Sequence, residues 1–187
     1  MTKSVKVTIE GLSPLLMHAY PMVPIEAVEK KTVEEQAELA AYRDPDGSLC
    51  IPSTAIQRAL VAGAAYSKGK GRASLQKPAA ACLLVEELYL PLPKTNDSRG
   101  TAPHGRDFAI DSRPVVIPAT KGRVLRHRPI VHKWGTSFTL CYDDSLLSGK
   151  QVRQIVDDTG KNVGVLDFRP EKKGPFGRFI VTHWIDS

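Results

Sequence analysis

The residues with the clearest chemical character are positively charged, and they are concentrated in the middle of the chain. The net charge is +6 over 187 residues, and residues 94–133 contain nine Lys or Arg against three Asp, so this stretch holds the whole excess. Such a block creates a local field that attracts a polyanion, whereas evenly spread lysines would mainly aid solubility. The stretch predicts contacts to nucleic-acid phosphates by Arg113, Lys121, Arg123, Arg126, Arg128 and Lys133.

Two loops outside this stretch combine glycines with positive charge. The first, residues 68–72, follows a predicted helix, and its exposed amides and cations suit phosphate, although cations at a helix end also complement the helix dipole. The second, residues 167–179, adds aromatic rings that could stack on bases or pack in the core. The predicted contacts in the two loops are Lys68, Lys70 and Arg72, and Arg169, Lys172, Lys173, Gly174, Phe176, Gly177 and Arg178.

Catalytic and metal-binding patterns are weak in this sequence. No nucleophile elbow, P-loop, dinucleotide fingerprint or H-E-x-x-H motif occurs, and the histidines lack the usual metal-ligand spacings. The three cysteines are far apart and read as buried apolar side chains in a reducing compartment. His18 is the one candidate general base, so we expect a binding protein without a cofactor rather than an enzyme.

The elements that must position these residues alternate between strands and helices. A period-two pattern predicts a strand over 4–10, an apolar run predicts a buried strand over 82–92, and further strands are expected over 137–143 and 179–185. Helices are expected over 32–42, 53–68 and 148–161, with Thr32, Ser53 and Ser148 at their N-termini. Without the insertions, the order is that of the α+β, ferredoxin-like (RRM-like) β-α-β-β-α-β core, whose open sheet face binds RNA in recognition modules. We expect one domain over residues 1–187, with a basic hairpin arm that turns at 120–122 inserted at 93–133.

Three motifs carry a resemblance to a known family. They are the Gly-Leu-x-Pro-Leu-Leu segment after the first strand, the phrase Ile51-Pro52-Ser53-Thr54 leading into a helix with Arg58, and Gly174-Pro175-Phe176-Gly177-Arg178 near the end. Together they resemble the RAMP superfamily, and most closely the backbone subunits of CRISPR effector complexes, which polymerise along guide RNA. The resemblance implies that Ser53 and Arg58 hold RNA backbone, that the glycine-rich loop sits near the C-terminus, and that residues 93–133 form the arm called the thumb.

Two departures from the family pattern shape the expected function. RNA-cleaving backbone subunits place an aspartate after the first strand, but the segment 18–31 has none, and the chain is short for such a subunit, which suits a reduced or phage-encoded relative. We expect a cytoplasmic, sequence-independent binder of single-stranded RNA, or of DNA, that repeats along the strand with copies of itself and other effector subunits and has no membrane contact. The alternatives are an endoribonuclease that uses His18 and an assembly protein of a virus particle.

Overall fold

A four-stranded antiparallel sheet with helices on one face forms the body of the molecule. The computed structural model describes residues 2–69, 71, 73–93, 107–116 and 121–186. The sheet order is β4-β8-β1-β9, from strands β1 (Thr2–Gly11), β4 (Leu84–Val85), β8 (Gly135–Asp143) and β9 (Phe179–Asp186). Helices α3 (Ser53–Gly63) and α5 (Gly149–Asp158) connect them, so chain order and sheet order match the ferredoxin-like core and confirm the predicted fold class.

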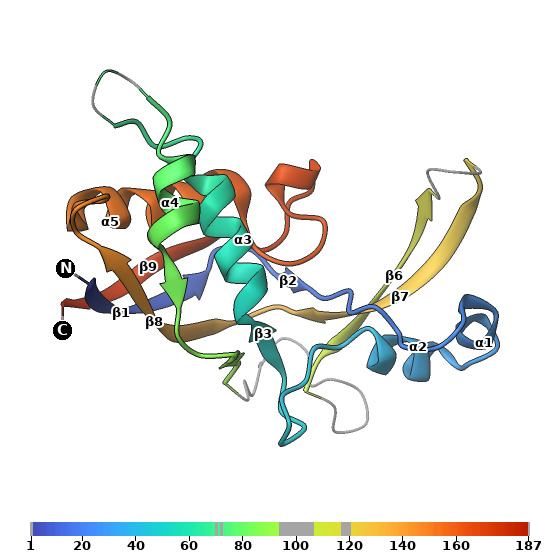
Figure 1. The fold of residues 1–187 in the computed structure, drawn as a ribbon. Coiled ribbons are helices and arrows are strands. Elements are labelled where there is room, and N and C mark those ends of the chain that lie inside the picture. The colour runs from blue at the N-terminus through green and yellow to red at the C-terminus, as the bar shows by residue number, and fades with distance from the viewer. Residues whose placement is uncertain (1, 70, 72, 94–106, 117–120, 187) are drawn as a thin grey trace.

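The alternation in β1 explains why the sheet buries one face. Val5, Val7 and Ile9 are fully buried, and together with Phe138 and Leu140 of β8 they belong to the hydrophobic core. The apolar stripes of α3 and α5 cover this face, and α4 (Gln76–Cys82) packs beside α3 (Figure 1). Burying these side chains between sheet and helices fixes the register of the strands.

The opposite face of the sheet does not offer the stacking platform of an RNA-recognition module. Lys6, Thr8 and Glu10 of β1 lie there, paired in register with Thr139, Ser137 and Gly135 of β8. Thr8 Oγ1 and Ser137 Oγ are 2.8 Å apart, so the hydroxyls satisfy each other. The other side chains that the strand register places on this face are polar or aliphatic except His183, which pairs in register with Thr8, so the face lacks the set of aromatic rings on which recognition modules stack several bases.

The arm was predicted as a hairpin, and its described part is one. Strands β6 (Ala109–Val116) and β7 (Arg123–Val131) pair antiparallel from Ala109↔Ile130 to Val116↔Arg123, and they extend away from the sheet (Figure 1). The base of β7 also pairs with β2 (Leu15–Leu16). Of the predicted turn, 120 lies outside the described residues, as do 94–106, so the arm's bounds of 93 and 133 stay a prediction.

Several local elements differ from the expectations. The apolar run 82–92 is two short strands, β4 and β5 (Tyr89–Pro91), and β5 pairs with β3 (Cys50–Pro52). Helix α3 ends at Gly63 instead of 68, and Gly63 packs closely on Thr159, whose side chain would lie 1.9 Å from a Cβ at this position.

The remaining elements are short and surround the sheet. Helices α1 (Ile25–Glu29) and α2 (Val33–Leu39) lie beside the hairpin, a π-helical turn at Thr159–Val163 extends α5, and a 3-10 turn covers Pro170–Lys172. Within the described part of the chain, no helix has the length and apolar character needed to cross a membrane.

Candidate nucleic-acid interface

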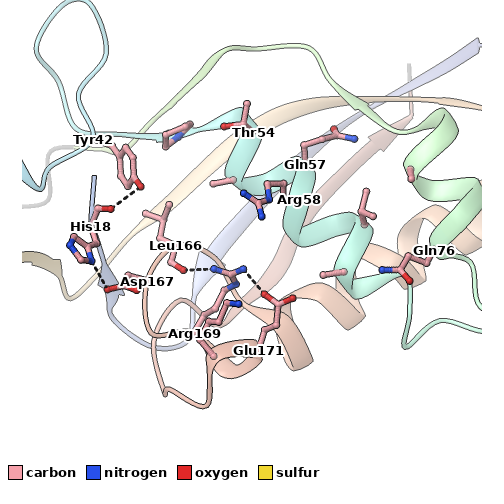
Figure 2. A pocket seen from close by; sticks show the side chains of 16 residues that line it. His18, Tyr42, Thr54, Gln57, Arg58, Gln76, Leu166, Asp167, Arg169 and Glu171 are labelled. Atoms are coloured by element: carbon pink, nitrogen blue, oxygen red, sulfur yellow. Dashed lines mark hydrogen bonds and ion pairs between the residues drawn. The ribbon is translucent and has the colours of Figure 1, made fainter. Parts of the chain in front are cut away.

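A groove of about 750 Å³ runs between α3 and the loop 164–178, which we call the tail loop (Figure 2). Its walls come from segments far apart in the sequence. Thr54, Arg58 and Ala62 line it from α3, and the tail loop contributes Asp167, Arg169 and Lys172. His18 and Tyr42 close one end. We call this site the groove.

The N-terminus of α3 opens directly onto the groove. Pro52 occupies the N-cap position with no side-chain cap, and Thr54 and Ala55 of the first turn line the groove. Amides at the start of an uncapped helix and the positive end of its dipole attract anions. The role predicted for Ser53 as N-cap is wrong, because Pro52 holds that position and Ser53 is the first residue of the helix. Ser53 is 6% exposed, and its amide donates to the Leu88 carbonyl.

Two cations on the groove wall have no acidic partner among the described residues. Arg58 is exposed on α3 and points toward the tail loop in Figure 2, and Lys172 is exposed on the opposite wall. Neither forms an ion pair with another described residue. Arg169 is held in place: its Nη1 donates to the Leu166 carbonyl at 2.7 Å, and its Nη2 pairs with Glu171. The groove therefore offers free positive charge from both sides.

A partly buried carboxylate anchors the end of the groove. Asp167 Oδ2 lies 2.5 Å from Arg128 Nη1 and 3.4 Å from His18 Nδ1, and Arg128 Nη2 lies 3.3 Å from Asp111 Oδ2. Burial alone would raise the pKa of Asp167, but the hydrogen bond with His18 and the charge of Arg128 outweigh it and hold the pKa at about 2. Asp167 is therefore ionised at neutral pH and orients His18, whose carbonyl accepts from the Tyr42 hydroxyl at 3.2 Å.

Backbone strain surrounds this carboxylate. Leu166 and Phe168, on either side of Asp167, have φ of 61° and 44°, in the left-handed region that non-glycine residues rarely adopt. Packing compensates, because Leu166 is buried and the Phe168 ring lies 6.0 Å from the ring of Phe176. Strain of this kind persists where the surroundings hold the backbone, and functional sites are a common place for it.

The aromatic and glycine residues of the tail loop serve packing. Phe176 is 8% exposed and clusters with Leu16 and Ile130, so it cannot stack on a base, which corrects that prediction. A Cβ at Gly174 would lie 1.7 Å from the Phe168 carbonyl oxygen, and one at Gly177 would lie 2.1 Å from that of Val165. Both glycines therefore permit close packing of the loop on itself.

Two arginines predicted to bind phosphate from the arm are committed inside the protein. Arg128 is 4% exposed and paired with Asp111 and Asp167, so its predicted phosphate contact is wrong. Arg113 pairs with Asp111 and lies 5.0 Å from the centre of the Phe176 ring. Internal carboxylates and rings thus occupy part of the charge that the sequence assigns to a surface.

The other cations of the arm do not share one face. Arg126 lies opposite Arg113 in the hairpin register, and Arg123, an odd number of residues away along β7, lies on the other face. Lys121 and Lys133 are exposed beyond the two ends of β7. A single continuous basic face along the described part of the hairpin is therefore not formed.

Five further predicted contacts have different outcomes. Lys68 is exposed and its Nζ lies 3.5 Å from the Ala65 carbonyl, while Lys70 and Arg72 lie outside the described residues. Lys173, which follows Lys172 of the groove wall, is exposed and has a φ of 61°. Arg178 donates to the Lys161 carbonyl at 2.5 Å, which ties its side chain to the π-helical turn at Thr159–Val163.

Sequence reasoning did not assign roles to Thr54, Tyr42 or Asp167. The first-turn position of Thr54 after a proline was a usable signal, because proline favours the start of a helix and its φ is fixed. Asp167 lies 149 positions after His18 in the chain, so no spacing rule could have joined them. In the described part of the chain, no three His, Cys, Asp or Glu side chains are grouped to hold a metal ion.

Core and groove together define an α+β, ferredoxin-like protein whose anion-attracting groove lies beside the sheet. No model of a protein family and no curated protein matches the sequence. Among solved structures, a chain in the cryo-EM structure of the type III-B Cmr-beta bound to cognate target RNA matches with a TM-score of 0.59 and 12% identity. The match covers 99% of this chain and 60% of that chain, so this protein spans about three fifths of its length and has a CRISPR effector-like fold.

Proposed function

We propose that this protein holds single-stranded RNA in the groove, as a subunit of an assembly that resembles a CRISPR effector complex. The observation that carries the proposal is the uncapped N-terminus of α3 beside the uncommitted cations Arg58 and Lys172. A sugar-phosphate strand passing between α3 and the tail loop would meet amides on one side and charges on both. Backbone contacts of this kind carry no sequence information, so binding is sequence-independent.

The fold supports the same proposal from a different direction. The similar Cmr-beta chain belongs to a structure bound to cognate target RNA. Two of the three motifs that resemble the RAMP superfamily flank the groove. Residues 51–54 lead into its α3 wall, and residues 174–178 complete the tail loop, whose residues 166–172 form the other wall. We therefore favour RNA over DNA, membership of that superfamily, and assembly with further copies or with other effector subunits.

A salt titration tests the electrostatic part of this proposal. Each neutralised phosphate of a single strand contributes about −0.7 to the slope of log affinity against log salt. Arg58→Ala and Lys172→Ala should each weaken binding of a short RNA and reduce the steepness of the slope by about 0.7. Lys150→Ala, which removes an exposed lysine on α5 outside the groove, is the matched control and should leave the slope unchanged.

The outcome of the titration decides the proposal. A wild-type slope near zero contradicts binding through phosphates. The other outcome is a steep wild-type slope of log affinity against log salt that neither Arg58→Ala nor Lys172→Ala changes. That result contradicts the groove as the binding surface, because cations elsewhere on the protein would then bind the phosphates.

A second candidate function is metal-independent RNA cleavage by His18. The observation that favours it is the 3.4 Å contact between His18 Nδ1 and Asp167 at the end of the groove, since a carboxylate can fix an imidazole for general-base work. We propose incubating a labelled hairpin RNA with the wild type and with His18→Ala. Cleavage by the wild type that is lost in the variant supports this function, and the absence of cleavage by either supports a pure binder.

A further inference from the structure

A separate cavity lies at the end of the sheet where β1 begins and where β8 and β9 end, beside the two chain termini (Figure 1). It measures about 850 Å³, and Lys3, Tyr142, Gly149 and Trp184 are among the residues that line it. None of its lining residues lines the groove, so the two sites are distinct. We call it the end cavity.

The N-terminus of α5 opens onto the end cavity with two of its amides unused. The capping box of Ser148 and Gln151 satisfies the amides of those two residues. The amides of Gly149 and Lys150, which come between them and line the cavity, donate to no acceptor in the part of the chain that the structure describes. Free amides at a helix N-terminus, together with the positive end of the helix dipole, attract an anion.

A buried hydroxyl gives a second, independent indication of a ligand. Tyr142 is 5% exposed and lines the end cavity, and its hydroxyl forms no hydrogen bond within the described chain. A Cβ on Gly149 would lie 3.0 Å from this hydroxyl, which places it beside the first turn of α5. A tyrosine hydroxyl in the interior normally has a partner, so an acceptor bound at the start of α5 would supply the missing one.

The other side chains of the end cavity also favour an acceptor. Three Lys or Arg side chains line it against one carboxylate, that of Asp186, which accepts from Trp184 Nε1 at 3.2 Å. Lys3 and Arg153 each pair with a carboxylate outside the lining as well. Hydrogen-bond donors, rather than a large net charge, therefore select the ligand.

We infer that the end cavity binds a phosphate group with three terminal oxygens. Such a group brings three strong acceptors and close to two negative charges, which the two free amides, the Tyr142 hydroxyl and the Arg153 guanidinium can share. A phosphodiester inside a nucleic-acid strand has fewer free oxygens and a single charge, so this site does not take the strand that the groove holds. Inorganic phosphate and a nucleoside monophosphate both offer the group, and the Trp184 ring gives the base of the second a surface to contact.

Isothermal titration calorimetry with inorganic phosphate, AMP and adenosine tests the site. We expect phosphate and AMP to bind and adenosine to bind far more weakly. Tighter binding of AMP than of phosphate supports a nucleotide as the source of the group, and equal affinities support the free ion. Binding of adenosine as tight as that of AMP, or no binding of either phosphate compound, overturns the inference.

Tyr142→Phe isolates the buried hydroxyl. It should weaken the binding of phosphate and AMP by about tenfold, the effect of losing one hydrogen bond to a charged group. Because the hydroxyl has no partner in the described chain, the thermal midpoint without ligand should not fall. Tyr66→Phe makes the same change at an exposed site outside both the groove and the end cavity and should leave the affinities unchanged. Equal affinities in the two variants overturn the site.

Gly149→Ala closes the site without weakening the helix. The added methyl group would lie 3.0 Å from the Tyr142 hydroxyl, and alanine favours the helical conformation over glycine. Binding of phosphate and AMP should therefore be lost while the thermal midpoint stays or rises, and binding that persists overturns the site. An RNA with hydroxyl ends should bind Gly149→Ala as it binds the wild type. Failure of the end cavity would thus leave the proposed function standing, and failure of RNA binding in the groove would leave the end cavity standing.

Discussion

At the scale of single residues, one carboxylate joins the interior of the protein to the groove. Asp167 and Asp111 together balance the buried Arg128, and Asp167 also orients His18 at the surface. Because both bonds depend on the same ionised group, the stability of the hairpin base and the geometry of the groove should change together. None of this could be predicted from spacing, since the partners come from the first loop, β7 and the tail loop.

We therefore predict that Asp167→Asn lowers the free energy of unfolding by about 3 kcal/mol, because it leaves a buried guanidinium poorly paired. The effect should depend on pH. The pKa of Asp167 is about 2, below the ordinary value near 4, so its contribution is fully present above about pH 4 and is lost as pH falls toward 2. Urea denaturation of wild type and variant should show the gap narrowing over that range.

The control for this prediction is Asp157→Asn, which removes an exposed carboxylate 3.0 Å from Arg153 on α5. Surface pairs of this type contribute about 0.5 kcal/mol or less. If both variants lose the same small amount at neutral pH, Asp167 does not stabilise the interior as described.

A second residue-scale prediction concerns the fit of the tail loop. Gly177 has φ 70° and a Cβ there would lie 2.1 Å from the Val165 oxygen, whereas Gly47 has φ 81° with open space around it. Both Gly→Ala changes cost about 1 kcal/mol for the backbone conformation, but Gly177→Ala adds a clash and should cost about 3 kcal/mol or more. Equal losses in thermal unfolding would show that the loop can move away.

At the scale of elements, the sequence predicts those with local signals and fails where contacts are distant. Thr32 with Glu35, and Ser148 with Gln151, form capping boxes, so α2 and α5 begin where expected. The run 82–92 breaks at 86–88, where partners distant in the chain bind it: the Glu87 carboxylate accepts from the Thr139 amide, and the Leu88 carbonyl accepts from the Ser53 amide. The burial of Arg128 could not be predicted from the sequence either, because the alternation of side chains along β7 does not indicate which face of the strand contacts a carboxylate.

The two capping boxes give a prediction about local and global stability. Ser148→Ala should lower the free energy of unfolding by about 1 kcal/mol, because α5 places Val152, Ile155 and Val156 in the core and unfolds with it. Thr32→Ala removes the same type of cap from α2, where Ala37 is the one buried residue. The thermal midpoint of the Thr32→Ala variant should therefore stay nearly unchanged, while hydrogen exchange of the α2 amides becomes faster.

Comparable shifts in the two midpoints would indicate that α2 unfolds together with the sheet. In that case the cavity of about 250 Å³ between β7, α2 and residues 18–21 would be as rigid as the core.

At the scale of the whole molecule, exposed positive charge is found in two places, the groove on the body and the distal end of the hairpin. The groove lies against the ferredoxin-like body, while the described cations at the distal end of the hairpin, Lys121 and Arg123, lie away from it (Figure 1). Charge arithmetic predicts a basic arm, but it cannot separate cations used in the interior from those that remain at the surface. The division suggests that the body binds the strand and that the hairpin reaches something else, which we propose is the next copy.

Shortening the hairpin tests that division. Replacing residues 115–124 with Asn-Gly, a sequence suited to a two-residue hairpin turn, keeps Arg113 on its aromatic partners and Arg128 between its carboxylates. The shortened protein should therefore fold, keep its thermal midpoint within a few degrees, and bind a short RNA through the groove nearly as tightly as the wild type. On long RNA, sedimentation velocity and electron microscopy should show regular multi-copy complexes for the wild type and single, scattered copies for the shortened protein. Arg58→Ala is the complementary control, because it should weaken binding to short and long RNA alike. If the shortened protein assembles as the wild type does, the hairpin is not the link between copies, and contacts must come from the edges of the sheet, where β4 and β9 each have one unpaired side.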